Sequence, residues 1–451
     1  MEKHGIAVAT ICTDEFFTLG KAEADCLGMP GLPIVQVPHP VAKLLPDQVT
    51  RLVAGAFDEV MHIWTADAEA LRAEYKAQTP KVSSRLRYHS LFEGNFNAAD
   101  APARFRAPDD YEAMNKLLYR RGWTDGLPIV PPTPERHENM MGAFDPDMLL
   151  GLIEPRQGQA TIAKTAANAV MAGCQPEHFP VLVAATRALN ETPLNVKALN
   201  TTTHPCAVLA LVNGPIAEAL DINGSYNAMG QGAVANAVIG RAIRLILLNI
   251  GGGTPGILDR ATFGTPAKYS FCFAENSDDN PWGETLAMER GFGAGQSTVT
   301  LCGVEGPHNV NDHYGMTAED ILLTIGGTMA TPGNNNSYLG GEIIVALGPE
   351  HAEVIARDGF TKSDIKDFLI KHAIIPGRTL SEPQRAIMTD YVADRFIGAD
   401  PQADARIVAS HDDVMLVVAG GAGRHSCVIP SFGGNTRSVT LPILDADGKP
   451  L

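Results

Sequence analysis

Apolar and polar residues follow two different periods in the first 77 residues. The short apolar runs at 6–12 and 34–37 are typical of strands. Two longer segments, 13–27 and 46–76, begin with capping or acidic residues and predict helices. One apolar face is expected on the second of these helices, formed by Leu52, Val53, Phe57, Val60, Met61 and Trp64. The pattern predicts a small βαβα domain over 1–77, with parallel strands.

The rest of the chain divides into a polar segment and a long apolar block. Residues 78–110 are rich in Arg, Asn, Ala and Pro and lack a sustained period, which predicts a linker or wrapping arm. Residues 111–451 predict a large α/β domain. Within it, the apolar runs at 207–215 and 342–349 each lead through Gly-Pro into a helix start. A third, shorter apolar run at 414–421 ends in Gly-Gly and repeats the first part of this pattern. Because the spacing is too irregular for a solenoid, two duplicated α/β halves are expected.

Composition and charge narrow the class of protein. A chain of 451 residues exceeds what one hydrophobic core usually serves. The 44 glycines and 31 prolines, without a triplet period, indicate many tight turns. A net charge of −16 without a Lys/Arg cluster argues against a nucleic-acid partner, and no apolar run is long enough to span a membrane. Seven cysteines without a CxxC pair argue against a disulfide framework and favour the cytoplasm.

A cysteine at a strand end is the first candidate for chemistry. Cys12 closes the first apolar run just before a helix start, where the partial positive charge of the helix lowers the pKa of a thiol. Asp14 and Glu15 oppose this effect, since neighbouring carboxylates disfavour a thiolate. Cys12 is therefore either a reactive thiolate or a buried core cysteine.

The densest polar stretch is 308–313, with the sequence HNVNDH. It follows an apolar strand, so His308, Asn309, Asp312 and His313 are expected in a strand-end loop that binds substrate, moves protons or holds a divalent metal. The His-x4-His spacing is not diagnostic of zinc. The alternative is a structural turn in which these polar side chains only form hydrogen bonds with one another and with the local backbone.

A second polar loop, at 201–206, has the sequence TTTHPC. Because Pro205 cannot continue a helix, Thr203 and His204 are expected in an exposed or cleft-lining loop ahead of a buried strand. Cys206 is a candidate nucleophile, since an imidazole two residues away can take its proton. A turn followed by a core cysteine is the alternative.

Two further segments carry candidate binding residues. The segment 268–276 alternates as a strand, with Lys268, Ser270 and Cys272 on one face, and is either a core strand or part of a site. The glycine-rich stretches include no P-loop and no G-x-G-x-x-G after a strand, so nucleotide binding has no support. Asn335 lies in an asparagine triplet whose amides suit neutral or anionic polar groups.

Several strings in the sequence point to one family. They are RGWTDGLP at 121–128 with VPP at 130–132, KYSFCFAEN at 268–276 with PW at 281–282, ERGF at 289–292, and GPHN at 306–309. Together they resemble the UGSC (seleno)protein family, which groups cytosolic bacterial proteins that pair a small N-terminal domain with a long α/β domain. The likeness is specific from about residue 120 onward and holds only in outline in the N-terminal domain.

The family takes its name from a U/C-G-S-C motif after the first strand. Here the strand end reads ATICT at 9–13, so Cys12 matches the final cysteine and Ala9 stands at the Sec/Cys position. The resemblance implies an enzyme. Because this sequence has one thiol at the motif where the family has two, the resemblance implies nucleophilic catalysis or redox chemistry with a single thiol. It does not imply a redox cycle between a dithiol and a disulfide.

The leading hypothesis is a cytoplasmic, oxidoreductase-like α/β enzyme that acts on a small polar or anionic metabolite through the Cys12 thiolate. The other candidates are His204, His308 and His313 for catalysis, Thr203, Asn309, Asn335 and Lys268 for substrate binding, and His308, Asp312 and His313 for a divalent metal. The rival is a metal- or His-assisted hydrolase or lyase that cleaves a C–S or C–N bond, with the N-terminal unit merely structural. A non-enzymatic scaffold is a third hypothesis. A homo-oligomer is expected in each case.

Overall fold

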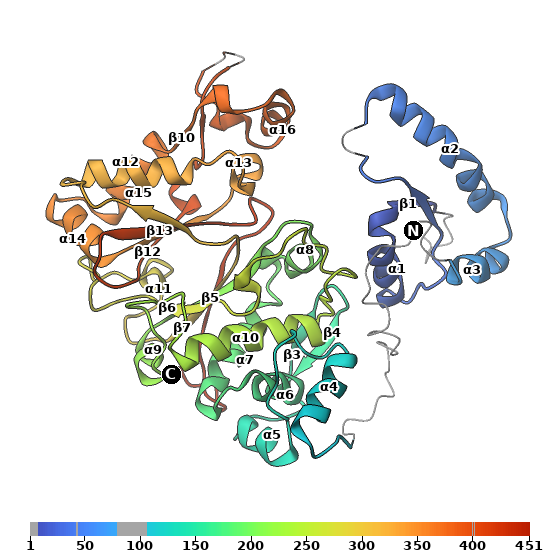
Figure 1. The fold of residues 1–451 in the computed structure, drawn as a ribbon, viewed down its shortest axis with the longest axis horizontal. Coiled ribbons are helices and arrows are strands. Elements are labelled where there is room, and N and C mark those ends of the chain that lie inside the picture. The colour runs from blue at the N-terminus through green and yellow to red at the C-terminus, as the bar shows by residue number, and fades with distance from the viewer. Residues whose placement is uncertain (1–7, 42–43, 79–105, 399, 401) are drawn as a thin grey trace.

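The N-terminal unit is a two-stranded parallel sheet flanked by helices. A computed structural model describes residues 8–41, 44–78, 106–398, 400 and 402–451 (Figure 1). The unit consists of β1 (Thr10–Thr13), α1 (Phe17–Cys26), β2 (Ile34–Val37), α2 (Pro46–Thr65) and α3 (Ala68–Lys76). Strand β1 pairs in parallel with β2, and Val35 and Val37 of β2 pack against residues of α2 and α3. The predicted linker or arm at 78–110 falls mostly outside the described residues.

The prediction of one continuous helix over 46–76 is wrong. The helix stops at Thr65, and Asp67 begins a new one because its carboxylate accepts the N–H groups of Glu69 and Ala70. The apolar face of α2 also differs from the prediction. Ala56 and Ile63 are buried, whereas much of the predicted face is exposed to solvent, namely Val53, Phe57, Met61 and Trp64.

Two four-stranded sheets with one shared pattern form the centre of the large part. Their orders are β14-β7-β5-β6 and β12-β9-β13-β8. In each sheet one parallel pair lies at an edge, and the next two pairings are antiparallel. The strands are β5 (Ala207–Asn213), β6 (Cys272–Ala274), β7 (Thr298–Val304), β8 (His308–Asn311), β9 (Ile343–Leu347), β12 (Val414–Val418), β13 (His425–Pro430) and β14 (Val439–Pro442).

The chain passes from one sheet to the other twice. Strand β8 follows β7 in the sequence but pairs with β13, and β14 follows β13 but pairs with β7. The two connections therefore cross between the sheets. At this crossing Val304 and Ser431 form an isolated antiparallel bridge. The N–H of Glu305 donates to the carbonyl of Pro430 at 2.8 Å, and the N–H of Phe432 donates to the carbonyl of Gly303 at 2.9 Å.

Helices cover the outer face of each sheet, which gives four layers (Figure 1). The first sheet is covered by α6 (Ile162–Ala172), α7 (Phe179–Ala188) and α10 (Val234–Asn249), and the second by α12 (Ala318–Met329), α14 (Pro349–Arg357) and α15 (Lys362–His372). On β5, Val208 and Ala210 pack with the helices, and Leu209 and Leu211 pack with the second sheet. All seven residues of β5 are consequently buried, as is typical of a strand covered on both faces.

The remaining helices and strands are short and complete the α/β fold that the sequence predicts. They are α4 (Tyr111–Arg120), α5 (Pro134–Met141), β3 (Leu149–Ile153), β4 (Gly158–Thr161), α8 (Val196–Thr201), α9 (Pro215–Ala219), α11 (Leu286–Glu289), α13 (Asn335–Leu339), β10 (Ile374–Ile375), α16 (Glu382–Val392) and β11 (Ala405–Arg406). None of the described helices combines the length and the apolar character needed to cross a membrane.

The predicted strand over 268–276 is shorter than expected. Only Cys272–Ala274 is a strand, and Lys268 ends a 3-10 turn that begins at Pro266. Lys268 and Cys272 therefore do not share a strand face. Phe273 does point into the core between the two sheets, as the alternation predicts.

Close backbone contact near the crossing leads to a stability prediction. Gly341 has a φ of +93°, and a Cβ added there would lie 2.5 Å from the carbonyl carbon of Gly433. Gly359 has a φ of +88° with open space around it. We expect Gly341→Ala to lower the free energy of unfolding by about 3 kcal/mol, from backbone strain plus overpacking, and Gly359→Ala to lower it by about 1 kcal/mol from strain alone. Thermal unfolding checks this, and equal losses in the two variants would contradict it.

Candidate functional site

His204 and Glu305 form a dyad beside the crossing of the sheets. His204 lies in the loop before β5, where Pro205 prevents α8 from continuing, and Glu305 directly follows β7. Because β5 and β7 are antiparallel, with Ala207 opposite Val304, the start of one strand lies next to the end of the other. The Nε2 atom of His204 is 2.8 Å from Oε1 of Glu305. Their side chains are only 10% and 21% exposed.

Glu305 determines which nitrogen of the imidazole carries the hydrogen. The same Oε1 accepts the backbone N–H of Asn335 at 3.0 Å, an arrangement that suits an ionised carboxylate. Nε2 of His204 then donates to Glu305, and Nδ1 presents a lone pair. This Nδ1 is buried, and no described residue gives it a hydrogen-bond partner. Leaving a buried polar atom unpaired costs about 1–3 kcal/mol, so the site is disposed to accept a hydrogen bond from a ligand.

The ring of His204 is held in place by the crossing segment. The Phe432 ring packs edge-on against it, with 5.5 Å between the ring centroids. Asn335 in turn donates its side-chain amide to the carbonyl of Phe432 at 2.9 Å. On the other side, the backbone N–H of His204 donates to the Thr202 hydroxyl at 3.0 Å. The imidazole is therefore fixed in orientation before any ligand arrives.

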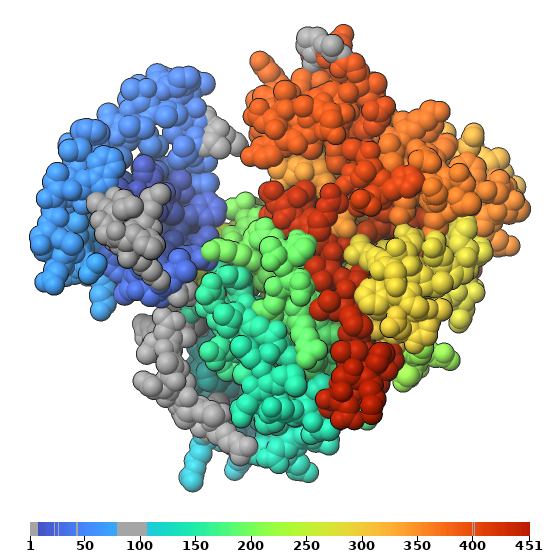
Figure 2. Space-filling model, turned by 180° about the vertical axis from the view of Figure 1, so that it is seen from behind, coloured from blue at the N-terminus to red at the C-terminus, as the bar shows by residue number. Residues whose placement is uncertain are grey.

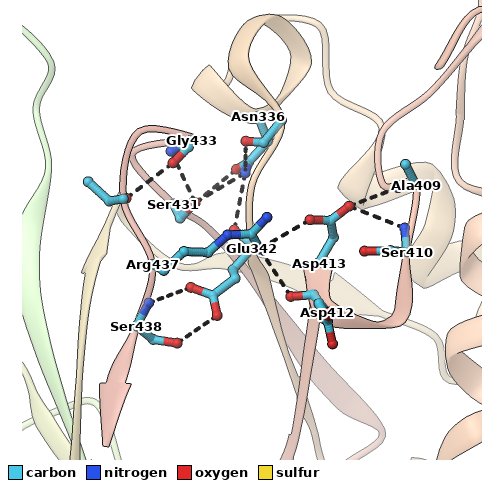
Figure 3. A network of polar contacts seen from close by, with 12 residues as sticks. Asn336, Glu342, Ala409, Ser410, Asp412, Asp413, Ser431, Gly433, Arg437 and Ser438 are labelled. Atoms are coloured by element: carbon cyan, nitrogen blue, oxygen red, sulfur yellow. Dashed lines mark hydrogen bonds and ion pairs between the residues drawn. The ribbon is translucent and has the colours of Figure 1, made fainter. Parts of the chain in front are cut away.

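A polar network begins at Asn336, the residue after Asn335, and includes Glu342, Ser431 and Ser438 (Figure 3). Asn336, the neighbour of Asn335, is fully buried and donates its amide to the Ser431 hydroxyl and to the carbonyl of Glu342, each at 3.1 Å. Its amide oxygen accepts the N–H of Ser431 at 2.9 Å. The Glu342 carboxylate accepts both the N–H and the hydroxyl of Ser438. These bonds join the β13–β14 connection to the start of β9.

A short segment, 259–262, links the dyad to other polar groups. Lys268 Nζ lies 2.8 and 2.6 Å from the two carboxylate oxygens of Asp259, and Arg244 lies 3.4 Å from one of them. The N–H of Thr262 donates to the carbonyl of Thr203 at 2.9 Å. The charge of Lys268 is thus engaged by Asp259.

The same segment contacts the N-terminal unit. Arg260 forms an ion pair with Glu15 at 2.7 Å, and its guanidinium lies over the ring of Phe16. A second ion pair joins Lys197 to Glu23 at 2.6 Å. Figure 2 shows the N-terminal unit, in blue, lying against the large part beside its green segments. The end of β1 is therefore placed near segment 259–262, which also reaches the loop of His204.

Cys12 does not have the environment of an activated thiol. It lies at the end of β1 and is partly buried. Burial raises the pKa of the Cys12 thiol, which is opposite to the shift that the helix start favours. Its role as a reactive residue stays a prediction.

The candidate nucleophile Cys206 lies in the core. It is buried, and desolvation raises its pKa to about 12, although the nearby Lys268 acts in the other direction. Its thiol faces the carbonyl of Leu199 at 3.9 Å instead of the imidazole of His204. The structure therefore agrees with the alternative of a turn followed by a core cysteine.

The predicted polar loop at 308–313 does not reach the dyad. Strand β8 carries it away from Glu305 along the edge of the second sheet. His308 is exposed with Nδ1 3.1 Å from the carbonyl of Asn309. His313 is exposed, and its Nε2 lies 3.3 Å from Nε2 of His425.

The proposed metal ligands His308, Asp312 and His313 do not come together. The carboxylate of Asp312 instead accepts two backbone N–H groups of its own turn and the hydroxyl of Thr324. These hydrogen bonds outweigh the effect of desolvation and lower the pKa of Asp312. Across the described ranges, no group of three or more His, Cys, Asp or Glu side chains is arranged to hold a metal ion.

The structure thus brings together only some of the predicted residues. His204, Asn335, Thr203 and Lys268 are connected through Glu305 and segment 259–262. Sequence reasoning did not find Glu305, Asp259 or Arg260. The one available signal for Glu305 was its place at the end of an apolar strand, ahead of Gly306-Pro307.

Comparison with known proteins gives one finding, and it concerns the N-terminal unit. Residues 1–66 match the model of the UGSC family, a range that ends one residue past α2 and includes Cys12. No curated protein and no solved structure matches the chain. The match does not include the strings of the large part that resemble the family. Over residues 1–66 the chain is therefore similar to the UGSC family.

Proposed function

We propose that the protein is an enzyme of the hydrolase or lyase type that acts on a small polar metabolite by acid–base chemistry at His204. The observation that carries the proposal is the buried Nδ1 of His204, which has no partner among the described residues while Nε2 is bound to Glu305. A histidine oriented by a carboxylate through one nitrogen is disposed to take a proton at the other. This is the His-assisted alternative of the sequence analysis.

The dyad has the parts that such a reaction needs. Nδ1 takes a proton from a water molecule, or from a carbon of the substrate, and returns it to the nitrogen or sulfur that leaves. Glu305 is a positioning residue that stabilises the imidazolium formed in between. The N–H of Asn335 keeps the carboxylate directed at the ring.

The surroundings of the dyad support a small polar substrate. The hydroxyl of Thr202 and the N–H of Asn335 lie next to the dyad, and segment 259–262, which carries charged residues, contacts Thr203. In that segment the cations and carboxylates compensate one another through the pairs Arg260–Glu15 and Lys268–Asp259. A substrate with hydrogen-bonding groups and little net charge is compatible with such a site.

A second candidate function is thiol chemistry at Cys12. The UGSC match includes this residue, and the Glu15–Arg260 ion pair brings its strand end toward segment 259–262. The raised pKa of Cys12 weighs against it, because the thiolate is the nucleophile.

We also propose a cytoplasmic, homo-oligomeric protein without a nucleic-acid partner. The six described cysteines that can be assessed are free, which agrees with a reducing compartment. The exposed apolar residues Val53, Phe57 and Trp64 on one side of α2 support association. The net charge of −16 supports the absence of nucleic acid.

Substitution of the dyad tests the proposed function. Purified protein is incubated with a small-molecule extract of cells, and the consumption of metabolites is followed by mass spectrometry. We expect His204→Asn to slow the consumption of one polar metabolite by about 10²–10⁴-fold, since general acid–base catalysis is lost. Glu305→Gln should slow the same reaction by a smaller factor than His204→Asn does. His411→Asn is the matched control, because His411 pairs with Asp367 on the surface at 2.7 Å. Equal rates in His204→Asn and the wild type would refute the proposal.

Alkylation tests the thiol alternative. Because the pKa of Cys12 is raised, its thiolate fraction at pH 7–8 is below that of a free cysteine, so iodoacetamide should modify it more slowly than the same peptide in the unfolded chain. The rate should keep rising above pH 9. Peptide mass spectrometry locates the modification, and Cys12→Ser is the control. Faster reaction than in the unfolded chain at pH 7 would instead favour thiol catalysis.

A further inference from the structure

We infer that His313 and His425 form a binding site for a borderline divalent cation such as Zn²⁺ at the far edge of the second sheet. The two Nε2 atoms are 3.3 Å apart. The rings are nearly perpendicular, at 85°, with their centroids 5.0 Å apart. Both side chains are exposed, so an ion from solution can reach them.

The separation of the two nitrogens is the one that a tetrahedral ion imposes. With Zn–N bonds of about 2.0–2.1 Å and a tetrahedral angle, two ligand nitrogens lie about 3.3 Å from each other. The pair matches this spacing without any movement of the rings. Two imidazoles leave further coordination positions to water, so the affinity should be lower than that of a closed structural site.

The strand pairing sets the protonation of one ligand. On β8 and β13, His425 is opposite Asn311, and Asn309 lies two residues away on the same strand. Nδ1 of His425 is 2.9 Å from Oδ1 of Asn309. An amide oxygen only accepts, so Nδ1 carries the hydrogen and Nε2 presents its lone pair. A histidine ligand commonly has such a partner behind it.

The other ligand sits on a turn that is fixed by hydrogen bonds. The Asp312 carboxylate accepts the N–H of Gly315 at 2.6 Å and the Thr324 hydroxyl at 2.9 Å. The carbonyl of Asp312 accepts from Nε2 of His351 at 3.0 Å and from Nε of Arg424 at 3.3 Å. His313 follows this anchored residue directly. Its backbone is therefore already ordered, and binding an ion causes little further loss of conformational entropy.

The charges in this turn compensate one another. Asp312 is negative and Arg424 is positive, and both belong to the same set of hydrogen bonds. Burial lowers the pKa of His351, which disfavours its charged form. Of the three metal ligands that the sequence suggested, this proposal retains only His313. His425 takes the place of His308 and Asp312. The inference is independent of the proposed function at His204.

Titration with Zn²⁺ alone, against a chromophoric chelator, tests the site on the full chain. We expect about one ion per chain in the wild type and at least tenfold weaker binding in His313→Ala and in His425→Ala. His308→Ala is the matched control, since His308 is an exposed histidine on β8 whose Nδ1 lies 3.1 Å from the carbonyl of Asn309, and zinc binding by this variant should equal that of the wild type.

A second measurement does not depend on the variants. Zn²⁺ added to the wild type should shift the imidazole proton resonances of His313 and His425 together and leave those of His308 in place. Binding that survives in both pair variants, or absence of binding in the wild type, would overturn the inference. In that case the contact between the two rings is a hydrogen bond only.

Discussion

The double passage of the chain between the two sheets is the constraint on which the rest of the large part depends. The β7–β8 connection leads into the second sheet and the β13–β14 connection returns to the first, so these two connections cross in the interior. Backbone groups at such a crossing have no regular ladder to satisfy them. Asn336 supplies partners on one side of the crossing, because from a fully buried position its amide bonds to Ser431 of the β13–β14 connection and to the carbonyl of Glu342. Its neighbour Asn335 is thereby fixed where it meets Glu305.

The position of the dyad follows from this arrangement. Glu305 lies on one connection and Phe432 on the other, and both contact His204. The N-terminal unit is joined to this region by the ion pairs Glu15–Arg260 and Glu23–Lys197, each with one partner largely open to solvent. Pairs of that kind contribute about 0–1 kcal/mol each. The geometry of the dyad is therefore a property of the large part and depends little on the N-terminal unit.

Local features were predictable from the sequence, and distant pairings were not. The apolar run at Ile34–Val37 is a strand with the predicted bounds, and Pro205 correctly placed His204 in a loop before a buried strand. Glu305 is 101 residues from His204, and its role appears only when the antiparallel pairing of β5 and β7 is known. The sequence left the direction of the Cys12 pKa shift open for a related reason, because its burial depends on packing that no local pattern reveals.

The two histidine sites differ in the partner behind the ring, and that difference separates their chemistry. His204 is bound to a carboxylate, which orients the ring through Nε2 and compensates the positive charge that forms when Nδ1 takes a proton during a reaction. His425 is bound to the neutral amide of Asn309, which fixes the tautomer and leaves Nε2 free to bind a metal ion. Exposure reinforces the distinction. The dyad is shielded from water, where an unpaired Nδ1 gains most from a substrate hydrogen bond, whereas His313 and His425 face solvent that can complete the coordination of an ion.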